Sequence, residues 1–143
     1  MDLNLLLFGK GDDSQRLSKL TRVEESGDVA SRLADADIGV LHLPNREVWQ
    51  HASPLKVAEF AAAGLPVVAS EVSGLERDRD AEWLTLIPLG DDGACKAAVL
   101  ELCNLSREER LRLGILARKE AEDSMSWEHC AASLHEMLLG VKR

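Results

Sequence analysis

SPLKVAEFAAAGLPVVAS, residues 53–70, is the stretch of this 143-residue chain that decides its fold. Ser53 is a favourable N-cap, and Pro54 suits the first helical position, where a missing N–H costs nothing. These residues predict a helix over 55–63 that Gly64 ends. A buried strand over 65–70 follows, with its proline near the start, where a sheet tolerates it. The stretch is therefore a helix that leads into a strand.

Further strands and helices alternate on both sides of this stretch. Short apolar runs predict strands over residues 3–8, 21–24, 38–43 and 83–88. Capping residues predict helices that begin at Asp28, at Asp91 or Asp92, at Ser106 and at Ser126. This alternation predicts a parallel sheet with helices on both faces, and the length suits one core. The predicted fold class is α/β: a single Rossmann-like, doubly wound parallel sheet domain over residues 1–143.

Composition excludes several classes of function. The formal net charge of −8 argues against nucleic acid or an anionic membrane as the main partner, because both require a basic surface. The three cysteines and four histidines show no metal-ligand spacing, so no metal site is predicted, and free thiols suit a reducing compartment. No signal-peptide start and no apolar run of about 20 residues are present, which predicts a cytoplasmic protein. No residue is assigned a catalytic role.

The candidate site lies at the start of the predicted helix over 55–63. In sheets of this class, ligands bind outside the carboxyl ends of the strands. Lys56 lies in the first helical turn, where the helix dipole disfavours a cation, so we expect it to hold an anion together with the free N–H groups of that turn. A lysine that reaches into solvent is an equal alternative. Glu59, flanked by apolar residues, needs a partner, which is either a ribose diol or an arginine from elsewhere.

A weaker pattern follows the first predicted strand. Gly9 and Gly11 would allow phosphate to approach the backbone closely, and the acidic pair Glu24-Glu25 comes further on. This pattern is typical of an NAD-type dinucleotide-binding domain, but Ser14 stands where that fingerprint has its third glycine. A plain turn between strand and helix is the simpler interpretation.

Residues 53–70 resemble the signature of family 4 (group 1) glycosyltransferases, which often reads S-P-x-K-x-x-E-x-x-A-x-G-x-P-V-V-A. Four more stretches resemble motifs of the same family in the same order, at residues 34–40, 73–76, 86–91 and 126–128. The resemblance covers nearly the whole chain. It implies the GT-B architecture of two Rossmann-like domains, of which this chain is the C-terminal, donor-binding half.

The resemblance also implies roles for individual residues. N–H groups in the segment Ser53, Pro54 and Leu55, those of Ser53 and Leu55, lie near the diphosphate of a nucleotide-sugar, Lys56 offers its charge, and Glu59 bonds the ribose. His51 and Glu76 are lesser candidates near the sugar, and Gly9 and Gly11 match a family loop loosely. Such enzymes transfer a hexose-type sugar from a UDP-, GDP- or ADP-sugar to a glycan or a lipid-linked acceptor. They retain the anomeric configuration and need neither a metal nor a further cofactor.

Three departures from the family pattern accompany this resemblance. His51 stands eight positions before Glu59, where many members have a second glutamate. The Arg and Lys pair that grips the diphosphate precedes the first strand in the family, and this chain begins at that strand. The acceptor-binding domain is missing, so we expect a separate domain or partner chain to supply it, against which the helix over 127–139 would pack.

The expected partners are thus a nucleotide-sugar and the acceptor-binding half, with no nucleic acid. The chain alone is not expected to catalyse, and peripheral membrane association of the full enzyme through its other half is compatible with this view. Two alternatives stay open. One is the NAD-type domain, and the other is a degenerate interaction module without a ligand.

Overall fold

The computed structural model describes residues 5–8, 21–24 and 29–140. The chain forms two compact units, Met1–Asp35 and Ala36–Arg143. That residues 1–143 act as one donor-binding domain therefore stays a prediction.

The first unit contains two parallel strands and a short helix. Strands β1 (Leu5–Phe8) and β2 (Thr21–Glu24) pair with Leu5 opposite Thr21. Both strands were predicted, and their parallel pairing is what an α/β fold requires. Helix α1 (Val29–Leu33) is shorter than the sequence suggested. The proposed cap Asp28 and the glycines Gly9 and Gly11 lie outside the described residues.

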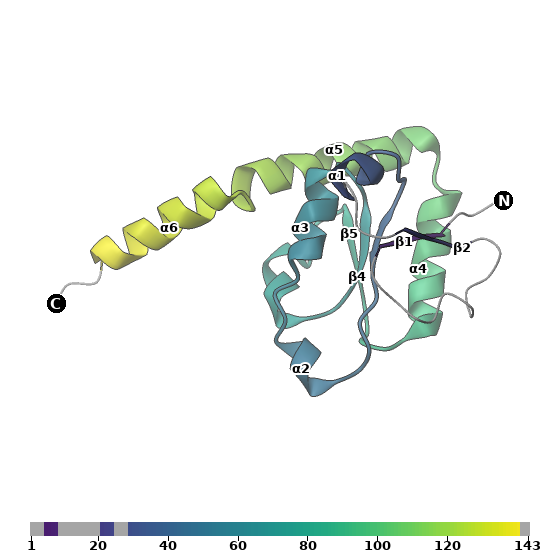
Figure 1. Ribbon diagram of the computed structural model, residues 1–143, viewed down its shortest axis with the longest axis horizontal. Helices are drawn as coiled ribbons and strands as arrows, with labels where there is room; N and C mark the ends of the chain where they lie inside the picture. The colour runs from purple at the N-terminus through teal and green to yellow at the C-terminus, as the bar shows by residue number, and fades with distance from the viewer. Residues whose placement is uncertain (1–4, 9–20, 25–28, 141–143) are drawn as a thin grey trace. The chain divides into compact units, whose positions relative to one another are not determined.

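The second unit is built on a three-stranded parallel sheet. Its strands β3 (Gly39–Leu41), β4 (Val67–Ser70) and β5 (Leu84–Ile87) are ordered β3-β4-β5 (Figure 1). In this register Val40 lies opposite Val68, and Val68 lies opposite Thr85. All four residues of the central strand are buried, as expected for a strand covered on both faces. The α/β fold class predicted from the sequence is confirmed.

Helices cover both sides of this sheet. In Figure 1, α3 lies on one side of the strands and α4 on the other. The helical elements of the unit are, in chain order, α2 (Glu47–Gln50), α3 (Leu55–Ala62), the 3₁₀ helix η2 (Ser73–Asp78), α4 (Asp92–Asn104), α5 (Arg107–Ser124) and α6 (Trp127–Gly140). Every predicted helix that falls among the described residues is present, with ends shifted by a few residues.

The core is apolar and contains little aromatic surface. Trp83 is the large exception and is almost fully buried. Each helix contributes apolar side chains that lie four residues apart along one face, as amphipathic helices do. These are Val57 and Ala61 of α3, Ala98 and Leu102 of α4, and Leu113, Ala117 and Ala121 of α5. Helices thus pack closely on both sides of β4, and this packing fixes the position of α3 relative to the sheet.

Helix α6 differs from the others because it packs on very little. It continues beyond α5 and extends away from the sheet (Figure 1), and none of its residues is buried. A two-residue break at Met125 and Ser126 separates it from α5. Ser126 caps it, as predicted, through a hydrogen bond of 3.1 Å from the His129 N–H to the Ser126 Oγ. No described helix is long and apolar enough to cross a membrane.

Candidate functional site

The carboxyl ends of the three strands are held together by hydrogen bonds from the backbone. The Leu43 N–H, just beyond β3, donates to the Ser70 Oγ at 2.9 Å, and Ser70 ends β4 and is fully buried. The Gly90 N–H, beyond β5, donates to the Leu43 carbonyl oxygen at 2.9 Å. These bonds bring together the loops that leave the sheet at this edge, which we call the carboxyl edge. Ligands bind at this edge in open α/β sheets.

Helix α3 begins at the carboxyl edge without a side-chain cap. Ser53 was predicted to be the N-cap, which is wrong: Pro54 occupies that position, with φ −79° and ψ 105°. The fixed φ of proline suits an N-cap as well as a first helical residue, so the sequence alone did not decide the position. The N–H groups of Leu55 and Lys56 therefore find no acceptor among the described residues. Such open N–H groups are what an anion binds.

The side chains of Lys56 and Glu59 bind each other. The Lys56 Nζ lies 2.6 Å from the Glu59 Oε2, and the two side chains are 59% and 46% exposed. The partner of Glu59 in the structure is thus Lys56 rather than an arginine from elsewhere, and Leu55 of the first turn is also 63% exposed. An exposed pair at this spacing contributes only about 0.5 kcal/mol. A ligand can therefore separate the two charges at small cost.

Two sequence motifs that are far from each other along the chain meet beside the start of α3. The Gly74 N–H, in η2, donates to the Ala52 carbonyl oxygen at 3.2 Å. A Cβ at residue 74 would lie 2.5 Å from that oxygen and 2.7 Å from the Ser53 Cα. Only glycine allows this contact between backbones. The motif over 73–76 thus lies directly against the beginning of the stretch over 53–70.

Glu76 is exposed and bound to an arginine. The Arg79 Nη2 lies 3.0 Å from the Glu76 Oε2, and the same guanidinium also binds Glu71. The hydrogen bond from Arg79, and then its charge, lower the pKa of the Glu76 carboxyl below its ordinary value. Glu76 is therefore a carboxylate at neutral pH. It can accept hydrogen bonds from hydroxyl groups but cannot donate a proton.

His51 lies at the end of α2, in the loop that joins β3 to α3. It is exposed, and its ring makes no hydrogen bond with any residue that the structure describes. The structure thus brings His51, Glu76 and the first turn of α3 to one edge, whereas it leaves Gly9 and Gly11 undescribed.

A histidine and aspartate pair at the carboxyl edge was missed by the sequence analysis. The His42 Nε2 lies 2.7 Å from the Asp92 Oδ1, which joins the end of β3 to the first turn of α4. A carboxylate only accepts hydrogen bonds, so in the neutral ring Nε2 carries the proton and the buried, unbonded Nδ1 is an acceptor. Fifty residues separate the partners. The one available signal was a histidine near the end of the strand predicted over 38–43, and the strand ends just before it.

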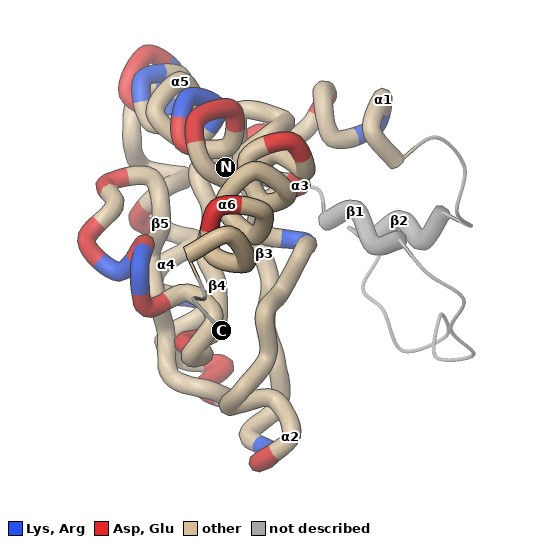
Figure 2. Tube along the Cα trace, turned by 90° about the vertical axis from the view of Figure 1, so that its left-hand side faces the viewer, with Lys and Arg blue, Asp and Glu red and all other residues tan. Residues whose placement is uncertain are grey.

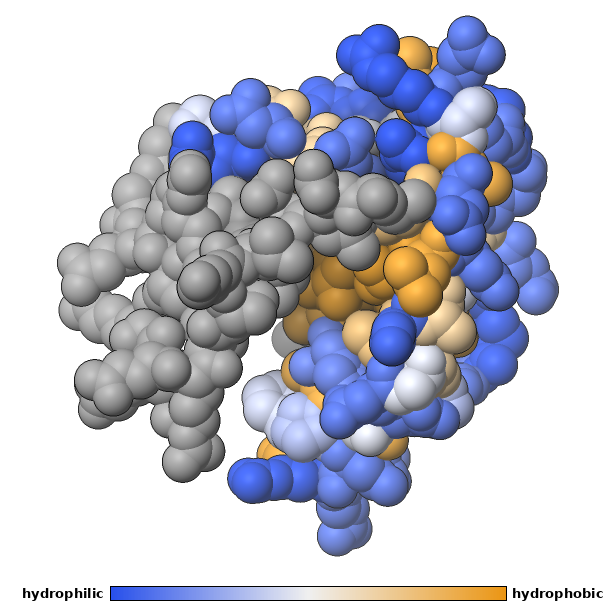
Figure 3. Space-filling model, turned by 90° about the vertical axis from the view of Figure 1, so that its right-hand side faces the viewer, coloured by the Kyte–Doolittle hydropathy of each residue, from blue (hydrophilic) through white to orange (hydrophobic). Residues whose placement is uncertain are grey.

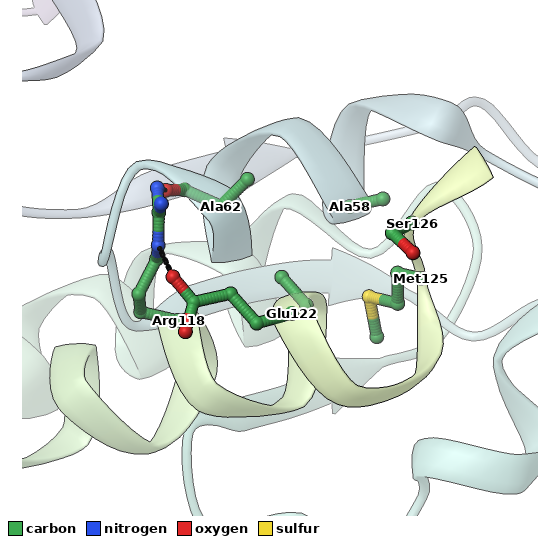
Figure 4. Close-up of a pocket in the computed structure, with 7 residues that line it drawn as sticks. Ala58, Ala62, Arg118, Glu122, Met125 and Ser126 are labelled. Atoms are coloured by element: carbon green, nitrogen blue, oxygen red, sulfur yellow. Dashed lines mark hydrogen bonds and ion pairs between the residues drawn. The ribbon is translucent and has the colours of Figure 1, made fainter. Parts of the chain in front are cut away.

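A pocket between α3 and α5 lies away from this edge. It encloses about 210 Å³ and is lined mainly by alanines and Met125 (Figure 4). Its cation, Arg118, bonds the Ala62 carbonyl oxygen and lies 2.6 Å from the Glu122 carboxylate. Arg118 thus stabilises the last turn of α3, where the helix dipole favours a cation. The pocket offers a ligand no free charged group.

The described residues form no cluster of three or more His, Cys, Asp or Glu side chains, so this part of the chain offers no candidate metal site. The polar groups that converge at the carboxyl edge are a helix start, basic side chains and carboxylates. Such a set suits an anion that also carries hydroxyl groups.

Comparison with known proteins agrees with this geometry. The family described as glycosyl transferases group 1 matches residues 1–104, which include β1 to β5, the start of α3, η2 and all of α4. No curated protein matches the chain. Because the family match covers well over half of the 143 residues, the chain belongs to the group 1 glycosyltransferases.

Proposed function

We propose that this chain binds the nucleotide-sugar donor of a metal-independent, retaining glycosyltransferase that transfers a hexose-type sugar. The observation that supports the proposal is the start of α3, which has open N–H groups and a lysine where helices ordinarily carry a cap and a carboxylate. The family match gives this helix start its chemical context.

The diphosphate of the donor would bind at the first turn of α3. The N–H groups of Leu55 and Lys56 would donate to the phosphate oxygens, and the Lys56 ammonium would turn from Glu59 towards them. Bonds from charged donors to phosphate are about twice as strong as neutral ones. The same groups would stabilise the charge that develops on the departing diphosphate, which is an electrostatic form of catalysis.

The ribose of the donor would bind to Glu59. Once Lys56 turns to the diphosphate, the Glu59 carboxylate is free to accept hydrogen bonds from both ribose hydroxyls. Its 46% exposure leaves it accessible without a change in the backbone. Glu76 and His51, near the same edge, are lesser candidates for contacts with the sugar.

The acceptor would be bound by a second half of the enzyme. Transfer requires that donor and acceptor are held together, so this donor site would act with an acceptor-binding half. Helix α6 is the candidate contact, because Trp127, Leu134 and Leu138 share one face and are all exposed. Exposed apolar surface of this kind marks an interaction site. Figure 3 shows that the described part of one face also carries apolar side chains beside hydrophilic ones. We place the protein in the cytoplasm, and membrane contact would come through the other half.

A binding screen tests the proposal. The melting temperature and the heat of binding would be measured with UDP, GDP, ADP and NAD, because a ligand of the folded state raises the melting temperature. We expect one nucleoside diphosphate to bind and to name the base of the donor. Binding of NAD alone would support a dinucleotide-binding domain instead. A folded protein that binds none of the four would support the interaction module.

The role of Glu59 can be separated from its ion pair with Lys56. We expect Glu59→Gln to weaken binding of the preferred nucleotide about tenfold, because an uncharged amide forms weaker bonds with the ribose diol. The 2′-deoxy form of that nucleotide should lose much less affinity. If Glu59 only neutralises Lys56, the substitution frees the lysine and should strengthen binding of both forms. That result in calorimetry would remove Glu59 from the ribose site.

A further inference from the structure

The carboxyl edge carries more negative than positive charge. The described acidic residues on its loops and first helical turns are Glu47, Glu71, Glu76, Asp78, Asp91 and Asp92, with Glu59 one turn further along α3, and the basic ones are Arg46, Lys56, Arg77 and Arg79. Figure 2 shows blue and red segments side by side at α2 and on the loops at this edge. A diphosphate that binds here meets carboxylates nearby. It therefore needs a cation whose charge is not already compensated.

Three of the four cations are already bound to carboxylates. Lys56 lies 2.6 Å from Glu59. Arg79 bridges Glu71 and Glu76. The Arg77 Nη2 lies 3.4 Å from the Glu120 Oε1 and donates to the Ser124 Oγ at 2.6 Å, and its Nε bonds Asp78. Each of these side chains must leave an acidic partner before it can bind an anion.

Arg46 is different, because its guanidinium contacts no carboxylate among the described residues, and its side chain is exposed. Its backbone, in contrast, is well fixed. Its N–H donates to the Pro44 carbonyl oxygen at 2.8 Å, and its carbonyl oxygen accepts from the Trp49 N–H at 2.9 Å. The exposed Arg46 side chain is thus carried by a turn whose backbone is held by hydrogen bonds.

The preceding residue anchors this turn to the carboxyl edge. Asn45 packs against Gly90, where a Cβ would lie 2.9 Å from the Asn45 nitrogen. Gly90 also bonds Leu43, so the turn that carries Arg46 is tied to the end of β5 as well as to β3. The backbone of Arg46 is therefore held at the same edge of the sheet as the start of α3.

We infer that Arg46 is a second diphosphate-binding residue of the donor site, an inference that rests on the proposed function. The guanidinium can donate two parallel hydrogen bonds to a phosphate group, which an ammonium cannot. Arg46 supplies a positive charge that no described carboxylate neutralises, whereas the Lys56 ammonium must leave the Glu59 carboxylate before it can bind the ligand. The two cations together hold the diphosphate between the loop after β3 and the first turn of α3.

Calorimetry on Arg46→Gln tests this role. The variant keeps a polar side chain of similar reach and removes the charge, and since the native side chain has no described partner the fold is unaffected. We expect the affinity for UDP, GDP or ADP, whichever binds, to fall about ten- to a hundredfold, which is the effect of losing hydrogen bonds to a charged group. The affinity for the parent nucleoside, which lacks phosphate, should not change. Lys119→Gln on α5 is the control, because it makes the same change in net charge away from the carboxyl edge.

The outcomes separate this inference from the proposed function. If Arg46→Gln binds the nucleoside diphosphate as tightly as the unchanged chain, Arg46 is not in the site and the donor-site proposal stands without it. If Lys119→Gln weakens binding as much as Arg46→Gln, the effect is one of overall charge and the inference is wrong. If the unchanged chain binds no nucleoside diphosphate, both the inference and the proposed function fail.

Discussion

The first turns of α4 and α5 differ from the first turn of α3 in every feature that stabilises a helix start. In α4, the Asp91 Oδ1 accepts a hydrogen bond of 2.8 Å from the Ala94 N–H. In α5, the Ser106 Oγ accepts one of 3.1 Å from the Glu109 N–H. Both helices also carry acidic residues in the first turn, where the helix dipole favours them.

Helix α3 has neither a cap nor an acidic residue at its start. Pro54 has no side-chain acceptor to offer, and the charged residue of the first turn is Lys56 in α3 but Asp92 in α4. A missing cap costs about 1 kcal/mol, and an unfavourable charge costs about 0.3–1 kcal/mol. The difference teaches that α4 and α5 begin in the way that best serves stability, whereas α3 does not. Helices α3 and α4 both begin at the carboxyl edge, and of the two only α3 lacks a side-chain cap.

The largest expected effect concerns the lysine that distinguishes α3. We expect Lys56→Gln to weaken binding of the nucleoside diphosphate more than tenfold, since a charge-assisted bond to phosphate is lost. The free energy of unfolding should change by less than about 0.5 kcal/mol, because loss of an exposed ion pair and relief of the helix dipole offset each other. Calorimetry and urea unfolding measure the two quantities.

Lys96→Gln is the control for this prediction, because Lys96 is an exposed lysine of α4 away from the first turn. It should change neither quantity. If Lys56→Gln leaves nucleotide binding intact, the open start of α3 is not an anion site, and its contrast with α4 and α5 has no functional meaning.

The second prediction concerns a substitution that lowers stability but leaves nucleotide binding unchanged. Ser106→Ala removes the cap of α5 and should lower the free energy of unfolding by about 1 kcal/mol. Nucleotide affinity should stay unchanged, because α5 begins outside the carboxyl edge. Urea unfolding followed by circular dichroism measures the loss. An unchanged midpoint would mean that water replaces the Ser106 hydroxyl at no cost, and that caps do not distinguish the two kinds of helix start.

The same contrast explains which parts of the fold the sequence could predict. The caps Ser106 and Ser126 were predicted correctly, and Asp91 was one of the two residues predicted for the start of α4, because each cap bonds a residue three positions away. The cap of α3 was placed one residue too early. The backbone there is set by the contact of Ser53 with Gly74, which joins residues that are far from each other along the chain. Local patterns therefore sufficed wherever the interactions were local.

The helix that carries the candidate site was predicted, but the contacts of its side chains were not. Glu59 was expected to bind a ribose diol or an arginine, and its pairing with Lys56 was not foreseen. Arg79 with Glu71, and His42 with Asp92, required the positions of separate loops. Arg46 stands out only because the other cations of the edge have partners, and no sequence pattern reveals a missing partner.

The smallest expected effect compares two carboxylates that are held in the same way. Arg79 lowers the pKa of Glu76 at the carboxyl edge, and Arg112 lowers the pKa of Glu109 in the first turn of α5, in each case mainly through a hydrogen bond. A carboxyl whose pKa is lower in the folded state contributes stability above its unfolded pKa. That contribution is lost as the pH falls through the folded value. Titration of both carboxyl carbons by NMR should therefore give pKa values below the ordinary 4.5.

Addition of the nucleoside diphosphate should then separate the two carboxylates. The negative charge of the ligand raises the pKa of a nearby carboxyl, because it disfavours a second negative charge. The pKa of Glu76 should rise when the nucleotide binds, whereas that of Glu109, which is not part of the edge, should not move. Equal shifts at both residues would point to a change throughout the domain. A shift at neither would place the ligand away from η2 and would remove Glu76 from the site.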